Sequence, residues 1–161
     1  MFKSKSLNYE IDSNRNGDMI VDEKKLRDSF EQALKVKEAG SGRLFFDELM
    51  DFEFHYDEEE EKVVIHVPVT KIMHNPVGFL HGGVMTYIAD TAMGHLCAVF
   101  SKPSVSLELK TQFFKTVKEG TIKATAYFVK KGRTVQFIEC TLEDEKDQLI
   151  AKVTATFYTI S

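Results

Sequence analysis

The chain has 161 residues, enough for one domain with a sizeable buried core, and its two cysteines are too few for a disulfide framework. Hydrophobic residues make up 43% and charged residues 29%, which is ordinary for a soluble globular protein, and the net charge of −4 gives no general case for a nucleic-acid partner. No apolar run approaches the roughly 20 residues that span a bilayer, and the polar start of the chain lacks a signal-peptide pattern. We therefore expect a cytoplasmic protein with no membrane partner.

Charge is distributed unevenly along the chain. Residues 1–62 hold 17 acids and 10 bases, whereas residues 102–133 hold eight bases and two acids. A basic region of this kind suits a phosphate-bearing small ligand, although an ordinary solvated strand face has the same composition.

The first 40 residues differ in pattern from the rest. Residues 1–21 are polar, and residues 22–38 place apolar side chains at helical spacing. We expect an accessory N-terminal arm with an amphipathic helix over residues 1–40 and the main domain over residues 41–161. Residues 12–23 fit the pattern of an EF-hand calcium loop, but only 11 residues precede them and no paired second loop follows, so an ordinary turn is preferred.

The main domain alternates short strands with one long helix. Residues 82–100 are apolar nearly all round, which predicts a helix buried on most sides, and Pro68 suggests that its strand lies near a sheet edge. The expected strands span residues 52–56, 62–70, 104–114, 121–130, 134–142 and 148–160. Short turns between the later strands predict an antiparallel meander. The fold class is therefore α+β, with a curved antiparallel sheet wrapped around a long central helix.

The start of this helix carries the most informative residues. The first amides of a helix have no intrahelical partner, so Gly82 and Gly83 offer bare N–H groups to an incoming oxygen. Asp90 is the only charged residue in the helix, and burying a lone carboxylate is costly. An amide pair that polarises a carbonyl, together with one buried acid, indicates acyl chemistry.

Structural alternatives exist for these residues. The Asp90 carboxylate could be satisfied by the hydroxyl of Thr86 or Thr91, and the glycines could serve helix packing. Asn75 could be a turn residue before a proline. His81 is expected to brace the loop rather than to transfer protons.

The remaining chemistry-bearing residues form no recognisable constellation. His55, His66 and His74 lack the spacing of metal ligands, so neither a metal nor another cofactor is expected. His95 lies about 140° around the helix from the acid and cannot form a dyad with it. Cys97 lies among apolar residues, which favours a buried, inert thiol.

The order of elements and the motifs resemble the hotdog-fold acyl-CoA thioesterases of the phenylacetate-degradation (PaaI-like) group. The resemblance covers residues 44–160, and the first 40 residues match nothing in that family. It rests on Asn75, the run His81-Gly82-Gly83, Asp90, the strand opening Val105-Ser106-Leu107-Glu108-Leu109 and the turn Lys131-Gly132-Arg133. It implies the hotdog fold and hydrolysis of an acyl-CoA to a free acid and coenzyme A, with no metal or redox cofactor.

The resemblance also implies roles for four catalytic residues. The glycine matching Gly82 donates its N–H to the thioester carbonyl, and the asparagine matching Asn75 places the substrate or water. The acid matching Asp90 is the nucleophile or the general base. The serine matching Ser106 orients the attacking water.

Four further residues are candidates for substrate binding. His81 and Gly83 flank the carbonyl donor at the helix start. Gly132 and Arg133 lie in a basic turn and are candidates for the phosphates of coenzyme A, because a planar guanidinium binds phosphate well.

The spacing of the catalytic residues predicts an assembly. Gly82 and Asp90 are eight residues apart on one helix, about 12 Å along its axis, which an aspartate side chain cannot bridge. A site that uses both requires two helices and hence a symmetric dimer. The family is dimeric or tetrameric with interfacial sites, so a homodimer or a dimer-of-dimers tetramer is expected.

Two other functions are compatible with this fold. A non-catalytic acyl-CoA sensor would carry a DNA-reading module, for which the single helix at residues 22–38 is too little. A hotdog dehydratase or hydratase uses a histidine with an acid, where this chain has Asn75. The sequence leaves open the acyl preference, coenzyme A against acyl carrier protein, and the nucleophile or base role of Asp90.

Overall fold

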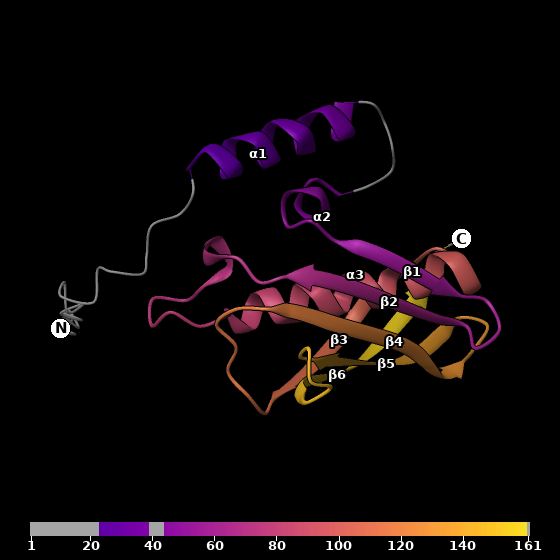
Figure 1. The fold of residues 1–161 in the computed structure, drawn as a ribbon. Coiled ribbons are helices and arrows are strands. Elements are labelled where there is room, and N and C mark those ends of the chain that lie inside the picture. Colours follow the sequence, from indigo (N-terminus) through magenta and orange to yellow (C-terminus); the bar gives the residue numbers. More distant parts are fainter. Residues whose placement is uncertain (1–22, 39–43, 161) are drawn as a thin grey trace, which may run out of the picture.

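The computed structural model describes residues 23–38 and 44–160 (Figure 1). Helix α1 (Glu23–Glu38) and the short α2 (Phe45–Leu49) precede the sheet and the long helix α3 (Gly82–Phe100). All of the EF-hand-like segment except Glu23 lies outside the described residues. Within residues 23–38 and 44–160, no helix is long and apolar enough to cross a membrane.

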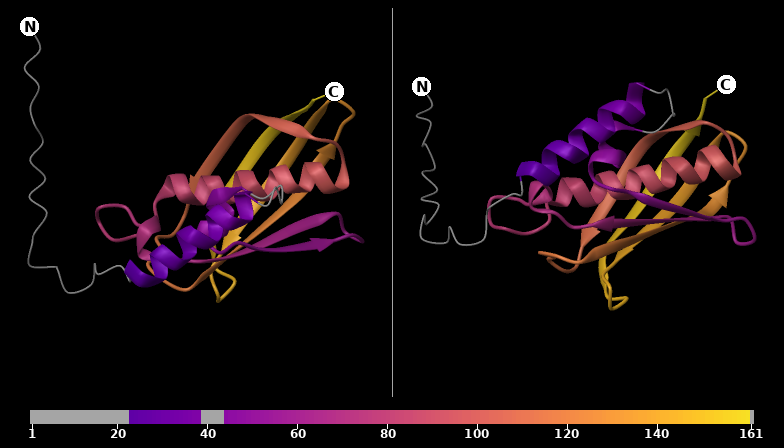
Figure 2. Two further views of the ribbon diagram at one scale, coloured as in Figure 1. Left: turned by 90° about the horizontal axis from the view of Figure 1, so that it is seen from above. Right: turned by 45° about the horizontal axis from the view of Figure 1, so that its top comes forward.

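Six strands form one antiparallel sheet that curves around α3 (Figure 2). They are β1 (Glu53–Asp57), β2 (Lys62–Pro68), β3 (Ser104–Phe113), β4 (Thr121–Lys131), β5 (Val135–Glu143) and β6 (Leu149–Thr159), and the one-turn helix η2 (Lys71–Met73) follows β2. The order across the sheet is β1-β2-β4-β5-β6-β3. The expected α+β hotdog fold is thereby confirmed, with strand bounds within two residues of those expected.

Helix α3 has the bounds that the sequence predicts, and it fills the concave side of the sheet. Its buried apolar residues are Met85, Ile88, Ala89, Ala92, Met93, Leu96 and Cys97. Burial in β2 alternates along the strand, so Val63, Ile65 and Val67 face the helix and their neighbours face outward. Small alanines on α3 let the sheet approach closely, which explains why this helix can be wrapped by a continuous sheet.

One of two expectations about strand neighbours is wrong. Strand β3 pairs with β6, so only β4, β5 and β6 form a meander, and the chain crosses from β3 to β4 through residues 114–120. Strand β2 pairs with both β1 and β4, so it is not itself an edge strand, but it lies next to the end strand β1 and thus near the edge, as Pro68 suggests. Pro68 is tolerated because it is the last residue of β2 and lies beyond the Glu53–His66 pair, where β1 no longer lies opposite β2, so its missing N–H costs no bond to β1.

A β-bulge in β3 sets which of its side chains face α3. Ser106 pairs with Phe157 and Glu108 pairs with Thr156, which leaves Leu107 as the extra residue. A bulge shifts the alternation of side chains by one position. Ser106 before the bulge and Thr111 after it therefore both point toward the helix, although they are an odd number of residues apart.

The N-terminal helix contacts the domain through aromatic rings. The Phe30 ring of α1 lies 5.3 Å from the Phe45 ring of α2, and the Phe46 ring lies 6.2 Å from that of Tyr87 on α3. The helix expected over residues 22–38 is thus present as α1, and it packs on the domain by way of α2.

Gly132 in the β4–β5 turn allows a test of the packing. A Cβ at this position would lie 2.2 Å from the backbone oxygen of Val135, so Gly132→Ala should lower the free energy of unfolding by about 1–3 kcal/mol. Gly94→Ala is the matched control, because a Cβ there meets nothing within 4 Å and the site is inside a helix. It should raise the free energy of unfolding by about 0.5–1 kcal/mol. Urea unfolding measures both, and equal effects would contradict the prediction.

Candidate active site

His81 caps the N-terminus of α3. Its Nδ1 accepts a 2.9 Å hydrogen bond from the Gly83 N–H, and its own backbone N–H donates to the Met73 carbonyl over 2.9 Å. The expectation of two bare amides is therefore wrong for Gly83, whose N–H is occupied by the capping imidazole. No hydrogen bond to the Gly82 N–H is present in the part of the chain that the structure describes. Of the two glycine amides, only that of Gly82 is without a hydrogen-bond partner among the residues described.

Asn75 folds the loop that leads into the helix. Its Oδ1 accepts hydrogen bonds of 3.1 Å from the backbone N–H groups of Val77 and Phe79. The Asn75 backbone N–H donates to the Phe79 carbonyl over 2.7 Å. Asn75 is thus a turn-forming residue, as in the structural alternative, and its side-chain NH₂ is the group that can still contact a substrate.

The β3–β4 loop holds this segment from outside. His74 Nε2 lies 2.8 Å from the Lys118 carbonyl oxygen, and the Leu80 N–H donates to the Val117 carbonyl over 2.7 Å. Lys118 Nζ lies 5.1 Å from the centre of the Phe79 ring. These contacts fix the position of the loop that carries Asn75.

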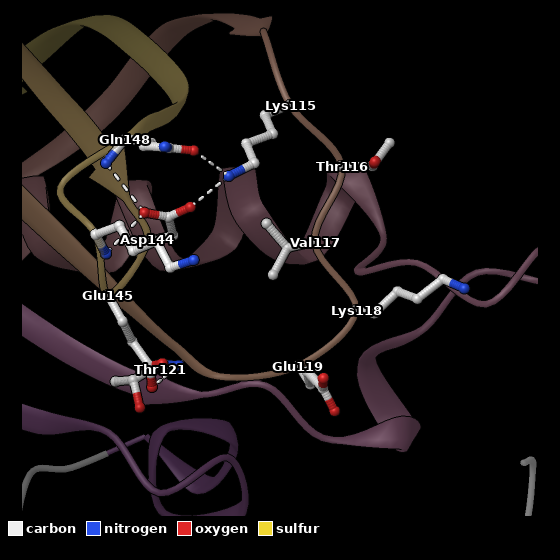
Figure 3. A pocket seen from close by; sticks show the side chains of 10 residues that line it. Lys115, Thr116, Val117, Lys118, Glu119, Thr121, Asp144, Glu145 and Gln148 are labelled. Atoms are coloured by element: carbon white, nitrogen blue, oxygen red, sulfur yellow. Dashed lines mark hydrogen bonds and ion pairs between the residues drawn. The ribbon is translucent and has the colours of Figure 1, made fainter.

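A hollow of about 330 Å³ lies beside the β3–β4 loop (Figure 3). Lys115 Nζ in its wall lies 2.5 Å from both Asp144 Oδ2 and Gln148 Oε1, so it ties this loop to the β5–β6 turn. Three lysines and three acids line the hollow. Because these charges balance, the hollow shows no preference for a phosphate.

A row of residues on α3, one turn apart, lies against β3. The pairs in contact along this row are Gly82–Phe113, Thr86–Thr111 and Asp90–Ser106. A Cβ on Gly82 would lie 3.0 Å from the Phe113 ring, which shows how closely that ring covers the glycine. The structure therefore places three of the four expected catalytic residues along one seam, with Asn75 in the loop before it.

Asp90 is an under-satisfied acid. Burial raises its pKa, and the hydrogen bond from Ser106 offsets part of that effect. Its Oδ1 is buried and has no hydrogen-bond partner among the residues described. The Thr86 hydroxyl donates to the Gly82 carbonyl over 3.1 Å and Thr91 interacts with Tyr87, so neither threonine satisfies the acid. One carboxylate oxygen of Asp90 is therefore buried without a hydrogen bond in the described chain.

Gly132 and Arg133 lie far from the glycine donor within one chain. They form the β4–β5 turn, next to the part of β5 where Gln136 Nε2 donates to Ser101 Oγ over 2.9 Å. Ser101 follows the last residue of α3. The β4–β5 turn thus lies near the C-terminal end of α3, whereas Gly82 is at its N-terminal end, about 27 Å away along the helix axis.

Two other residues considered from the sequence take structural positions. His95 Nδ1 lies 2.9 Å from the Tyr56 hydroxyl, and its ring stacks on Phe54 at 4.3 Å, so it is oriented away from Asp90. Cys97 is fully buried, and burial raises its pKa to about 11, as expected for an inert thiol.

Known proteins resemble this chain in sequence and in fold. A sequence model of the thioesterase superfamily matches residues 77–151. ComA2 of Bacillus subtilis, which is named as an esterase, is 36% identical over 94 residues, which are 56% of this chain and 75% of ComA2. The 1,4-dihydroxy-2-naphthoyl-CoA hydrolase of Listeria monocytogenes is 30% identical over 95 residues, 57% of this chain and 77% of that enzyme.

The fold matches that of PaaI, a protein of the phenylacetic acid degradation operon of Escherichia coli. The TM-score is 0.70 at 19% identity, over 83% of this chain and 96% of PaaI. The seam between α3 and β3 thus belongs to a hotdog domain whose relatives include a protein named as an esterase and one named as a CoA-thioester hydrolase. The chain is a member of the thioesterase superfamily and a thioester hydrolase.

Proposed function

We propose that the protein is an acyl-CoA thioesterase, which converts an acyl-CoA and water into a free acid and coenzyme A. The observation that carries the proposal is the Asp90–Ser106 pair, two turns along α3 from a Gly82 N–H that has no partner in the described chain. An acid can supply a base or a nucleophile, and an outward N–H can polarise a carbonyl. The name of the Listeria relative, which specifies a CoA thioester, supports coenzyme A as the leaving group.

Asp90 acts on the thioester carbon by one of two routes. As a general base, its carboxylate takes a proton from water while the water oxygen bonds to the carbonyl carbon. As a nucleophile, the carboxylate bonds to that carbon itself, and water then hydrolyses the anhydride. In both routes the carbon–sulfur bond breaks, and the thiolate of coenzyme A leaves and takes up a proton. The raised pKa of Asp90 favours the base route, since a base works best when its pKa is near the working pH.

The helix start stabilises the negative charge that develops on the carbonyl oxygen. The Gly82 N–H donates to that oxygen, and the positive end of the helix dipole adds to the effect. The Asn75 NH₂ places the substrate or water, while Ser106 orients the water that attacks. His81 and Gly83 shape this end of the substrate site through their mutual hydrogen bond.

The site needs two subunits. Gly82 and Asp90 lie about 12 Å apart along one helix, too far for one carbonyl group to meet both. Strand β3 is the last strand of the sheet on this side, and its Val105 and Leu107 are 46% and 62% exposed. An edge strand of this kind is a template for pairing with a second copy. Asp90 of one subunit then meets Gly82 of the other in a symmetric homodimer, alone or as half of a dimer-of-dimers tetramer.

The same symmetry gives the β4–β5 turn a role. If the two α3 helices run antiparallel, the C-terminal end of one lies beyond the N-terminal end of the other. Gly132 and Arg133, which lie near the C-terminal end of α3, then border the substrate of the neighbouring site. In this arrangement the Arg133 guanidinium binds a phosphate of coenzyme A, since its planar fork suits phosphate oxygens.

Replacing the acid tests the proposal directly. Asp90→Asn should lower kcat for acyl-CoA hydrolysis by at least about 10²-fold, because a positioned base contributes about 10²–10⁴-fold. Release of free thiol from a panel of aryl- and fatty-acyl-CoA thioesters measures the loss, and thioesters of acyl carrier protein form a parallel series. Asp51→Asn, a change at an exposed acid, is the matched control and should keep wild-type turnover. Wild-type turnover by Asp90→Asn would remove Asp90 from the mechanism.

Burial of Asp90 also has a cost in stability. The pKa of Asp90 in the folded protein lies above the value near 3.8 that it has in the unfolded chain. Ionised Asp90 therefore lowers the free energy of unfolding at pH values above the folded-state pKa. This loss of stability disappears below about pH 3.8, where Asp90 is protonated in both states. Asp90→Asn should therefore have a higher Tm than wild type at pH 7, and the gain should shrink as the pH falls toward about 4. Scanning calorimetry across this range checks it, and Asp51→Asn should show no such gain. A lower Tm for Asp90→Asn at pH 7 would contradict the prediction.

Mixing two inactive variants tests the two-subunit site. Gly82→Pro removes the donor N–H at the first helical position, where the backbone tolerates proline, and the Phe113 ring must shift slightly to admit the added Cβ, which would otherwise lie 3.0 Å from it. In a mixed dimer with Asp90→Asn, one site carries both lesions and the other carries none. Co-refolding the two variants should therefore restore up to about a quarter of wild-type activity. The Gly82→Pro variant alone should be about 10²–10³-fold less active than wild type, because it lacks the N–H donor, so the recovery is measurable. Mixed dimers with no recovered activity would show that the two residues do not share an interfacial site.

A further inference from the structure

Three metal-ligating side chains meet on the outer face of the β1–β2 hairpin, away from α3. Glu53 and His55 of β1 and His66 of β2 each place one ligand atom within 4.8 Å of the other two. His55 Nε2 lies 3.2 Å from Glu53 Oε1, and the two imidazole ring centres lie 5.2 Å apart. We call these three residues the hairpin cluster.

The register of the hairpin creates the cluster. Glu53 lies directly opposite His66, and His55 is two residues further along β1 on the same face. Residues directly opposite each other in an antiparallel pair have Cβ atoms about 4.5–5.5 Å apart. The ladder therefore holds the Cβ atoms of the three residues close together on one face, within reach of a shared ion. The sequence spacing of the histidines hides this, because the turn between the strands sets their distance.

We propose that the hairpin cluster binds a divalent transition-metal cation of the zinc type. Two imidazoles and one carboxylate form a ligand set suited to Zn²⁺, Ni²⁺ and Cu²⁺ and poorly suited to Mg²⁺ or Ca²⁺. With bonds of about 2.0–2.1 Å, neighbouring ligand atoms of a tetrahedral zinc site lie about 3.3 Å apart. The 3.2 Å between His55 and Glu53 matches this, and their side chains are 51% and 69% exposed, so they can adjust to the ion. Water completes the coordination.

The surroundings of the hairpin cluster favour a cation. Glu53, His66 and the acid Asp51 line one surface hollow of about 530 Å³, which leaves room for the ion and its water. Lys123 lies opposite His66 in β4, but its Nζ lies 2.9 Å from the Glu143 carboxylate and 2.7 Å from the Asp147 carboxylate. Its charge is therefore largely compensated.

Metal at this position would act on stability rather than on the thioester. Strand β1 is the other end strand of the sheet and pairs only with β2, so a bound ion would join the end strand to its neighbour. Asp90 faces β3, at the opposite end of the sheet. A ligand that binds only the folded state raises the free energy of unfolding by RT ln(1 + [L]/Kd), so Tm rises with its concentration.

Titration of the full chain with Zn²⁺ tests the proposal. We expect calorimetry to show saturable binding of about one Zn²⁺ per chain, a Tm that rises with Zn²⁺, and no competition by Ca²⁺ or Mg²⁺. The double variant His55→Gln, His66→Gln should lose both effects. Glu58→Gln, a change in the acidic turn of the same hairpin, is the matched control and should bind as wild type does. Absent binding, or binding that survives in the double variant, would overturn the proposal.

The histidine ring signals of the wild-type protein give a second measurement that does not depend on a variant. In NMR spectra, Zn²⁺ should shift the ring signals of His55 and His66 and leave those of His74 and His95 in place. Shifts confined to other histidines would mean that the ion binds elsewhere and that the hairpin cluster is an ion pair with a ring contact only.

Discussion

The contact between α3 and the end strand β3 is the interaction on which the proposed active site depends. Strand order places β3 last, beside β6, and the bulge at Leu107 turns both Ser106 and Thr111 toward the helix. In the middle of the sheet, the same strand would be paired on both edges and would close off the acid that it contacts. At the end of the sheet it leaves Asp90 beside an open edge. The proposed interfacial site depends on this order.

Local patterns in the sequence predict the elements well and their pairing poorly. The bounds of α3 follow from an uninterrupted apolar run that starts after a polar loop, and no distant residue is needed to predict them. The pairing of β3 with β6 depends on contacts between segments far apart in the chain, so the turns around β3 do not predict it. The bulge at Leu107 is not predictable either, because one extra residue leaves no recognisable signal in the composition or the length of a strand.

The candidate site shows the same division. Gly82 and Asp90 are predictable because a glycine at a helix start and a lone acid in an apolar helix are local signals. The sequence does not predict that the Gly83 N–H is already hydrogen-bonded, because that bond depends on the rotamer of the His81 side chain. The hairpin cluster is likewise invisible in the spacing of its histidines, because the alignment of two strands brings them together.

A second acid, Asp47, shows why Asp90 stands apart. Burial raises the pKa of both carboxyl groups, and each has one buried oxygen without a partner among the residues described. Asp47, however, is stabilised by the Tyr87 hydroxyl at 2.7 Å and by the backbone N–H of Leu44, three residues before it at the start of α2. An acid in the first helical turn that accepts a hydrogen bond from the N-cap residue stabilises the start of its helix. The second bond, from Tyr87, attaches α2 to α3, so Asp47 has a structural role. Asp90 lies in the middle of a helix with a single serine as its partner, against the end strand of the sheet. Among the residues described, the chain itself stabilises Asp47 at two points and Asp90 at one, which is why the proposed mechanism assigns the chemistry to Asp90.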